Sequence, residues 1–376
     1  MINLSKLLMP DQHDFPGDAI RFGVPRSPVI VWHITGRCNL RCRHCYSSSD
    51  DAPGSIWPGE LDDTEARLFL ASLPEIAPPT LLFSGGEPLV HPNFFSYIKI
   101  ARGLGLNVSI STNGTLIDAA AAAKIAAAGV SYVGVSLDGV RDENDDFRGR
   151  EGAFDEALNG IKALSVAGRQ DGRRIGLRVT LASPVLRNLD SLLALALDLP
   201  VSRICFYHFI PSGRGALDPA LMPEPFEERR AIERIISWAD GVCASRASRG
   251  EPPMEILTVG DASDGVLAYK YLLDLDRSRA DYARAFLVRS ASKRGAGILS
   301  VRWDGLVFEN QFSWDRPLGT WDEVFTRLAG GMALPLLRAS RHGAPVGCGW
   351  EDICSGSLRD FCSACGDVRA GVGHRK

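Results

Sequence analysis

Residues 35–46 read Thr35-Gly36-Arg37-Cys38-Asn39-Leu40-Arg41-Cys42-Arg43-His44-Cys45-Tyr46 and place three cysteines in one short loop. The loop directly follows the apolar run 29–32, which is predicted to be a buried strand. Thiolates are soft ligands, and a compact group of cysteines selects an iron–sulfur cluster or zinc. A [4Fe–4S] cluster normally takes four cysteines, so a loop that supplies three leaves one iron open for chemistry. A structural zinc loop is the alternative.

The size and charge of the chain are those of an ordinary globular protein. It has 376 residues, 45% of them hydrophobic and 23% charged, with a net charge of −3. That length accommodates one large domain and a smaller one. No apolar run of about 18 residues is present, and the N-terminal apolar stretch is too short for a signal peptide. We therefore expect a cytoplasmic protein with no membrane or nucleic-acid partner, in a compartment where clustered cysteines bind metal.

Short β-branched runs alternate with helical stretches between residues 29 and 215. The predicted strands are 29–34, 80–83, 107–111, 131–136, 175–181 and 203–209. The predicted helices lie near 62–73, 93–103, 117–128, 154–167 and 188–197. This alternation predicts an α/β fold with a parallel sheet and helices packed outside it. In such folds the reacting groups gather at the carboxyl ends of the strands.

Polar motifs stand at several of these strand ends. The paired Gly85 and Gly86 let the backbone approach a ligand closely, and the adjacent Glu87 carboxylate can accept hydrogen bonds from an ammonium group. The later strand ends and the fifth strand supply Asn113, Ser136, Asp138 and Arg178. Short polar side chains there can reach a ribose or a carboxylate, and a guanidinium is a natural carboxylate clamp. Turn formation and a structural ion pair are the alternative explanations.

Taken together, the cysteine spacing, the Gly-Gly-Glu motif and the polar strand ends resemble the radical S-adenosylmethionine (radical SAM) enzymes. The resemblance implies a partial (β/α)6 barrel. It also implies a [4Fe–4S] cluster on Cys38, Cys42 and Cys45 whose open iron binds S-adenosylmethionine. One electron then cleaves this cofactor to a 5′-deoxyadenosyl radical. The cofactor contacts that we expect are Gly85, Gly86, Glu87, Asn113, Ser136, Asp138 and Arg178.

A second group of cysteines lies in the glycine-rich tail, at Cys348, Cys354, Cys362 and Cys365. Four thiols can satisfy one [4Fe–4S] cluster completely, and a zinc site has the same count. The Cys-x5-Cys-Ser-Gly piece resembles the auxiliary-cluster extension called SPASM. Full SPASM patterns hold two clusters and more cysteines than this tail has, so we expect one auxiliary [4Fe–4S] cluster.

The pattern divides the chain into four predicted parts. Residues 1–27 form an N-terminal segment and residues 28–215 the partial barrel. Residues 216–295 resemble exposed amphipathic helices and are predicted to bridge two domains. Residues 296–376 form the SPASM-like C-terminal extension, which begins with a strand-like stretch.

Several further stretches narrow the resemblance to the haem d1 biosynthesis subfamily: 147–154, 207–215, 256–259 and 305–314. It implies an iron-containing tetrapyrrole substrate that loses propionate side chains, and a low-potential electron donor such as a ferredoxin or flavodoxin. Candidate substrate contacts are Arg148, His208 and Arg214, because carboxylates need cations and histidine is a common iron ligand. The alternatives are a radical SAM maturase of a ribosomal peptide and, in another class, a non-catalytic iron–sulfur carrier or scaffold.

Overall fold

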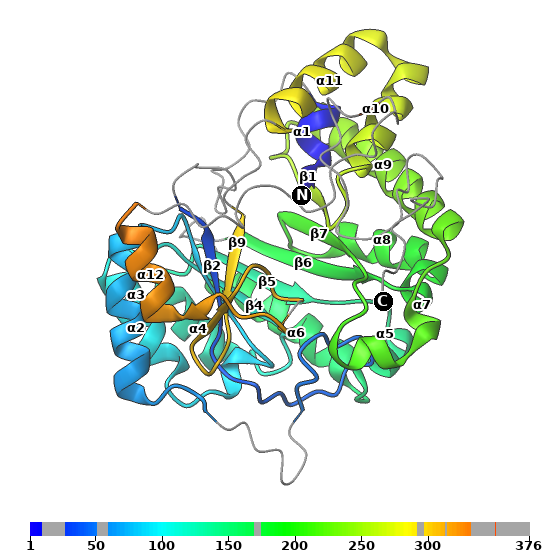
Figure 1. Cartoon of the computed structure of the whole chain (residues 1–376). Helices are drawn as coiled ribbons and strands as arrows, with labels where there is room; N and C mark the ends of the chain where they lie inside the picture. Colours follow the sequence, from blue (N-terminus) through cyan, green and yellow to red (C-terminus); the bar gives the residue numbers. More distant parts are fainter. Residues whose placement is uncertain are drawn as a thin grey trace, which may run out of the picture.

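A continuous sheet forms the centre of the molecule, and helices cover it (Figure 1). The computed structural model describes residues 1–9, 27–50, 59–168, 174–291, 297–312, 314–331 and 350. The predicted auxiliary-cluster ligands Cys348, Cys354, Cys362 and Cys365 lie outside these residues.

The sheet has eleven strands in the order β1-β8-β7-β6-β5-β4-β3-β2-β9-β10-β11. Six of them confirm the strands predicted from the sequence: β2 (Val29–His33), β3 (Leu81–Ser84), β4 (Val108–Thr112), β5 (Tyr132–Ser136), β6 (Arg174–Leu181) and β7 (Arg203–His208). Each pairs in parallel with its neighbour, as a chain of strand–helix units requires. Their carboxyl ends therefore share one edge.

The helices follow the predicted alternation: α2 (Asp63–Ile76), α3 (Phe94–Gly103), α4 (Ala119–Ala127), α5 (Asp142–Arg148), α6 (Ala153–Ala167), α7 (Ser183–Arg187) and α8 (Leu189–Asp198). Local sequence explains where they begin. Helix α2 starts with a capping box in which Asp62 and Glu65 bond each other's backbone amides. Helix α4 starts at Asp118, whose carboxylate accepts from the Ala121 amide. The short helices α5 and α7 were not predicted.

Aromatic packing joins the sheet to the helices outside it. Trp32 on β2 is buried, with its ring centroid 4.8 Å from that of Phe69 and 5.4 Å from that of Tyr97. Phe69 on α2 also contacts Trp321 and Phe325, at 5.8 Å between centroids in both cases. These two belong to α12 (Trp321–Ala329), so the C-terminal part packs onto the same core.

The three predicted boundaries, at 27/28, 215/216 and 295/296, need correction, because strands of one sheet lie on both sides of each. Residues 216–295 do contain helices, namely α9 (Pro225–Ser248), α10 (Asp264–Leu275) and α11 (Arg277–Ala291). They also contain β8 (Glu255–Val259), which continues the sheet in parallel beside β7. The segment is therefore part of the central fold as well as a helical layer.

The two ends of the described chain also join the sheet. The N-terminal segment supplies β1 (Ile2–Asn3), antiparallel to β8, and α1 (Leu4–Leu8), which lies beside the yellow-green helices in Figure 1. On the other side β9 (Ile298–Val301) is parallel to β2, and β10 (Leu306–Phe308) and β11 (Gly319–Thr320) are antiparallel. Of the helices described, none has both the length and the apolar character of a membrane span.

Candidate active site

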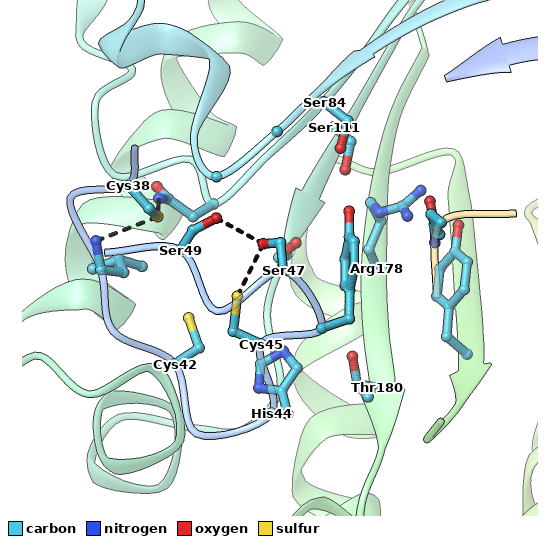
Figure 2. Close-up of a pocket in the computed structure, with 18 of the residues that line it drawn as sticks. Cys38, Cys42, His44, Cys45, Ser47, Ser49, Ser84, Ser111, Arg178 and Thr180 are labelled. Atoms are coloured by element: carbon cyan, nitrogen blue, oxygen red, sulfur yellow. Dashed lines mark hydrogen bonds between the residues drawn. The ribbon is translucent and has the colours of Figure 1, made fainter. Parts of the chain in front are cut away.

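A pocket opens at the carboxyl ends of the parallel strands, where the sequence predicted the reacting groups. One wall is the cysteine loop, and the opposite wall includes Arg178 and Thr180 of β6 (Figure 2). Many of the predicted residues line it: Cys38, Cys42, Cys45, Gly85, Gly86, Asn113, Ser136, Arg148, Arg178 and His208. The pocket therefore brings together residues that lie far apart in the chain, from Cys38 to Phe312.

The three cysteines are free thiols on one side of this pocket. Cys38 and Cys42 are buried, and Cys45 is partly exposed. Burial raises the pKa of the Cys38 and Cys42 thiols, so a metal is needed to hold them as thiolates. No group of three His, Cys, Asp or Glu side chains in the described ranges is placed to hold a metal ion.

Gly85 and Gly86 are required by the cysteine loop that packs against them. A Cβ atom at Gly86 would stand 2.1 Å from the Arg37 carbonyl oxygen, and one at Gly85 would stand 2.6 Å from the Thr35 oxygen. The Gly86 amide donates to the Thr35 carbonyl at 2.8 Å, and the Glu87 amide donates to the Arg37 carbonyl at 2.9 Å. The glycines therefore lie against the loop and line the pocket at the same time.

The Glu87 carboxylate is buried and is not among the groups that line the pocket. Its Oε1 accepts from the Thr112 hydroxyl at 2.8 Å and from the Leu89 amide at 3.2 Å, and its Oε2 accepts from the Asn113 amide at 2.7 Å. Burial raises its pKa to about 7. These bonds fit a residue that positions the strand ends better than the predicted direct contact with an ammonium group.

The strand-end residues separate into two groups. Ser136, Asn113 and Arg178 line the pocket, whereas Asp138 does not. The Arg178 guanidinium lies 4.4 Å from the centroid of the Tyr207 ring, and no salt bridge is found for it among the described residues. Asp138 is buried and forms an ion pair with Arg148. Arg148 is thus already paired with Asp138, so Arg178 is better placed than Arg148 to bind a carboxylate of a bound molecule.

Two of the residues predicted to contact substrate have protein partners instead. Arg214 donates to the carbonyl oxygens of Cys42, Ser48 and Ser49, at 2.8, 3.4 and 2.9 Å, and so holds the cysteine loop. His208 is buried, with its Nδ1 2.8 Å from Glu228 and its Nε2 2.8 Å from Asp264. Neither ring nitrogen of His208 is therefore left to coordinate iron. We no longer propose Arg214 or His208 as a substrate ligand.

The His208 ion pairs predict a pH dependence of stability. Burial by itself lowers the pKa of His208, but Asp264 and Glu228 together outweigh it and raise that pKa from 6.5 to about 10. The folded state thus binds a proton that the unfolded state releases, so this stabilisation is complete below pH 6.5 and is lost as the pH rises through 10. His208→Gln should cost about 3–5 kcal/mol at pH 7, because it leaves the carboxylates without their cation.

Thermal unfolding midpoints at pH 7 and pH 10 test this expectation. At pH 7 the His208→Gln variant should have a lower unfolding midpoint than the parent protein. Between pH 7 and pH 10 its midpoint should change less with pH than that of the parent protein. His91→Gln is the matched control, because burial lowers the pKa of His91 and that ring stays neutral across the window. A His208→Gln variant as pH-dependent as the parent protein would contradict the assignment.

Several further residues, which were not predicted from the sequence, complete the pocket: His44, Tyr46, Ser47, Ser49, Thr180, Tyr207 and Phe312. His44 stacks on Phe147 with the ring centroids 4.2 Å apart. Tyr46 and Phe312 meet edge to face at 5.4 Å, which brings the C-terminal part to the pocket. Adjacency to the cysteines was the signal available for His44, Tyr46 and Ser47.

The donor set fits a three-cysteine cluster with a polar cofactor beside it. Three thiols form one wall, and the hydroxyls of Ser84, Ser111 and Ser136 lie at the ends of successive strands. Hydroxyl groups can bond a ribose, and the Arg178 guanidinium can bond a carboxylate. Cys38, Cys42 and Cys45 would hold the cluster, and the strand ends would hold S-adenosylmethionine.

Comparisons with known proteins agree with this site. The family model for the radical SAM superfamily matches residues 32–189. The Fe-coproporphyrin III synthase of Methanosarcina barkeri is 35% identical over 93% of this chain and 87% of its own length. The pre-heme d1 synthase of Dinoroseobacter shibae is 31% identical over 96% of this chain and 88% of its own.

Two other similarities are more distant. The mycofactocin maturase MftC of Mycolicibacterium smegmatis is 33% identical over 58% of this chain and 54% of its own. The solved structure of anSMEcpe with bound AdoMet shares the fold, with a TM-score of 0.63, 16% identity and coverage of 91% of this chain and 92% of that one. The chain is therefore a radical SAM enzyme and belongs to the group that contains the haem and haem d1 synthases.

Proposed function

We propose that this enzyme removes propionate side chains from an iron-containing modified tetrapyrrole, in a reaction of the haem d1 type. The observation that carries the proposal is the extent of similarity. The two relatives named for tetrapyrrole products match 93% and 96% of this chain, whereas the peptide maturase MftC matches 58%. These two synthases thus share the C-terminal part as well as the radical SAM domain.

The pocket supports a substrate that carries carboxylates. Bound S-adenosylmethionine, cleaved by one electron from the cluster, supplies a 5′-deoxyadenosyl radical. The residues around it provide the rest of the site. Arg178, which can bond a carboxylate of the cofactor or of the substrate, presents a cation to the pocket, and a buried carboxylate needs such a partner. Phe312 and Tyr46 offer aromatic faces beside it, on which a flat macrocycle can pack.

We also propose one auxiliary [4Fe–4S] cluster, on Cys348, Cys354, Cys362 and Cys365. Four thiols on a glycine-rich tail match the ligand count of a closed cluster. Such a cluster has no open iron, so its role would be electron transfer or shaping of the substrate pocket. A cytoplasmic ferredoxin or flavodoxin would supply the electron that S-adenosylmethionine cleavage consumes.

Incubation with didecarboxysirohaem tests the substrate. Anaerobic protein, S-adenosylmethionine and a reductant should convert this tetrapyrrole to a lighter product, and tandem mass spectrometry should locate the loss at the propionates. An iron coproporphyrin has propionates and methyl groups but no acetates. A product of that kind would show that acetates are removed instead, and would overturn the propionate assignment.

A peptide maturase is the second candidate, because MftC shares the radical SAM part of the chain. If no tetrapyrrole binds at micromolar concentration and a small peptide encoded nearby is modified, the peptide assignment replaces ours. The non-catalytic carrier is no longer a candidate, because the full-length relatives are synthases.

A further inference from the structure

Three consecutive residues at the end of α5, which was not predicted from the sequence, contact the cysteine loop. The Phe147 carbonyl accepts from the Arg43 amide at 3.0 Å, and the Phe147 ring stacks on His44 at an interplanar angle of 5°. Gly149 has a φ of 71°, and a Cβ there would lie 2.5 Å from the Arg41 carbonyl oxygen. Residues 147–149 therefore form a docking turn beneath the loop, with Arg148 at its centre.

Arg148 uses this position to place a cation beside one cysteine. Its Nη1 donates to the Cys42 sulfur at 3.8 Å, and its Nη2 donates to the Asp138 carboxylate. The side chain is nearly inaccessible, with 7% of the residue exposed. Both ends of the planar guanidinium are thus occupied, one by a sulfur and one by a carboxylate.

Asp138 is itself held from several sides. Its Oδ1 accepts from the Thr180 amide at 2.6 Å, and its own amide donates to the Asn144 side chain at 3.0 Å. The His44 Nε2 lies 3.9 Å from its Oδ2. The carboxylate is therefore fixed between β5, β6 and α5, and it fixes Arg148 in turn.

The other two cysteines have neutral donors. Cys38 accepts from the Leu40 amide at 3.4 Å and from the Asn113 side-chain amide at 3.9 Å. The Cys45 sulfur lies 3.2 Å from the Ser47 hydroxyl. Among the hydrogen bonds of the described residues, the guanidinium at Cys42 is the charged donor to a sulfur of the loop. The three cluster ligands are therefore not electrostatically equivalent.

We propose that Arg148 raises the reduction potential of the three-cysteine cluster through Cys42, and that Asp138 is the residue that positions it. Reduction adds one negative charge to the cluster, and a nearby positive charge stabilises that state. Hydrogen bonds to the sulfurs and net charge are known determinants of iron–sulfur potentials. Burial of the guanidinium keeps solvent from screening the effect. The proposal concerns cluster reduction and is independent of the identity of the substrate.

A redox titration of the full-length anaerobic protein tests the proposal. The electron paramagnetic resonance signal that changes on addition of S-adenosylmethionine reports the three-cysteine cluster. In Arg148→Gln the ratio of reduced to oxidised cluster at a fixed potential should fall by about tenfold, which corresponds to about 59 mV for one electron. Arg148→Lys keeps the charge and should recover most of the loss.

Arg43→Gln is the matched control. It removes an equal charge from the same loop, but the Arg43 guanidinium faces Asp146 and Asp218 and is 37% exposed. Its removal should leave the potential close to that of the parent protein, because exposed charges are screened. An unchanged potential in Arg148→Gln, or an equal shift in the Arg43 variant, would overturn the proposal.

A second variant keeps the proposal testable if Arg148→Gln takes up no iron. Asp138→Asn removes the negative charge but keeps a side-chain oxygen that can accept from the Arg148 guanidinium, so Arg148 stays beside Cys42 and the reduced fraction should rise instead of fall. A fall in this variant would show that disturbed packing controls the potential, and would overturn the charge argument.

The activity assay adds a readout that a structural role would not give. Cleavage of S-adenosylmethionine by Arg148→Gln should slow with a flavodoxin as electron donor and recover with a stronger chemical reductant. Equal losses with both reductants would contradict a role in setting the potential.

Discussion

Replacing Cys38, Cys42 and Cys45 together with alanine will abolish the reductive cleavage of S-adenosylmethionine and remove half of the bound iron. The parent protein should hold about eight irons, as two [4Fe–4S] clusters, and the triple variant about four. The reason is that the three thiols form one wall of the pocket and are the predicted ligands of the cluster that supplies the electron. Iron analysis and detection of 5′-deoxyadenosine measure both outcomes.

Cys243→Ala is the control for the triple variant. Cys243 is a buried thiol on α9 and does not line the pocket, so its loss should change neither iron content nor cleavage. Two results would contradict the assignments. Retention of eight irons by the triple variant would show that the three cysteines are not cluster ligands. Zinc in place of the remaining iron would show that the cysteines of the tail do not hold an iron–sulfur cluster.

The sequence predicted the sheet well where strands and helices alternate regularly. All six strands from β2 to β7 lie close to their predicted positions, because β-branched runs and helical stretches there differ in composition. Strand β8 was missed because residues 255–259 form a short run between two long helical segments. Helix α5 was missed because Asp142–Arg148 is short and polar, with no apolar period to mark it.

The site was predicted less completely, for a different physical reason. A position at a strand end fixes which edge of the sheet a residue occupies, but not where its side chain points. Glu87, Asp138 and His208 all lie at the expected edge, yet each is held by buried partners. The partners Asn113 of Glu87, Arg148 of Asp138 and Asp264 of His208 are 26, 10 and 56 positions away, and no local pattern indicates them. The roles of Gly85 and Gly86 were easier to predict, because at each of them two backbone segments approach closely.

Gly86→Ala should disable the enzyme almost as completely as loss of the cysteines. The new methyl carbon would stand 2.1 Å from the Arg37 carbonyl oxygen and 3.0 Å from the Cys38 Cβ. Both neighbours belong to the cysteine loop, so the loop must move and Cys38 must move with it. A displacement of about 1 Å at a reacting centre can cost about 10²-fold in rate. Overpacking should add a stability loss of about 1–3 kcal/mol.

Iron content, cofactor cleavage and the thermal midpoint separate the local effect of Gly86→Ala from general destabilisation. Gly241→Ala is the matched control: it makes the same change on an exposed face of α9, where a Cβ meets nothing within 4 Å. Because alanine is favoured over glycine inside a helix, this control should be more stable by about 0.5–1 kcal/mol and fully active. The Gly86 variant should lose iron from the three-cysteine cluster even at temperatures well below its unfolding midpoint. Normal iron content and cleavage in that variant would show that the loop yields without moving Cys38, and that Gly86 is not needed to position the cluster.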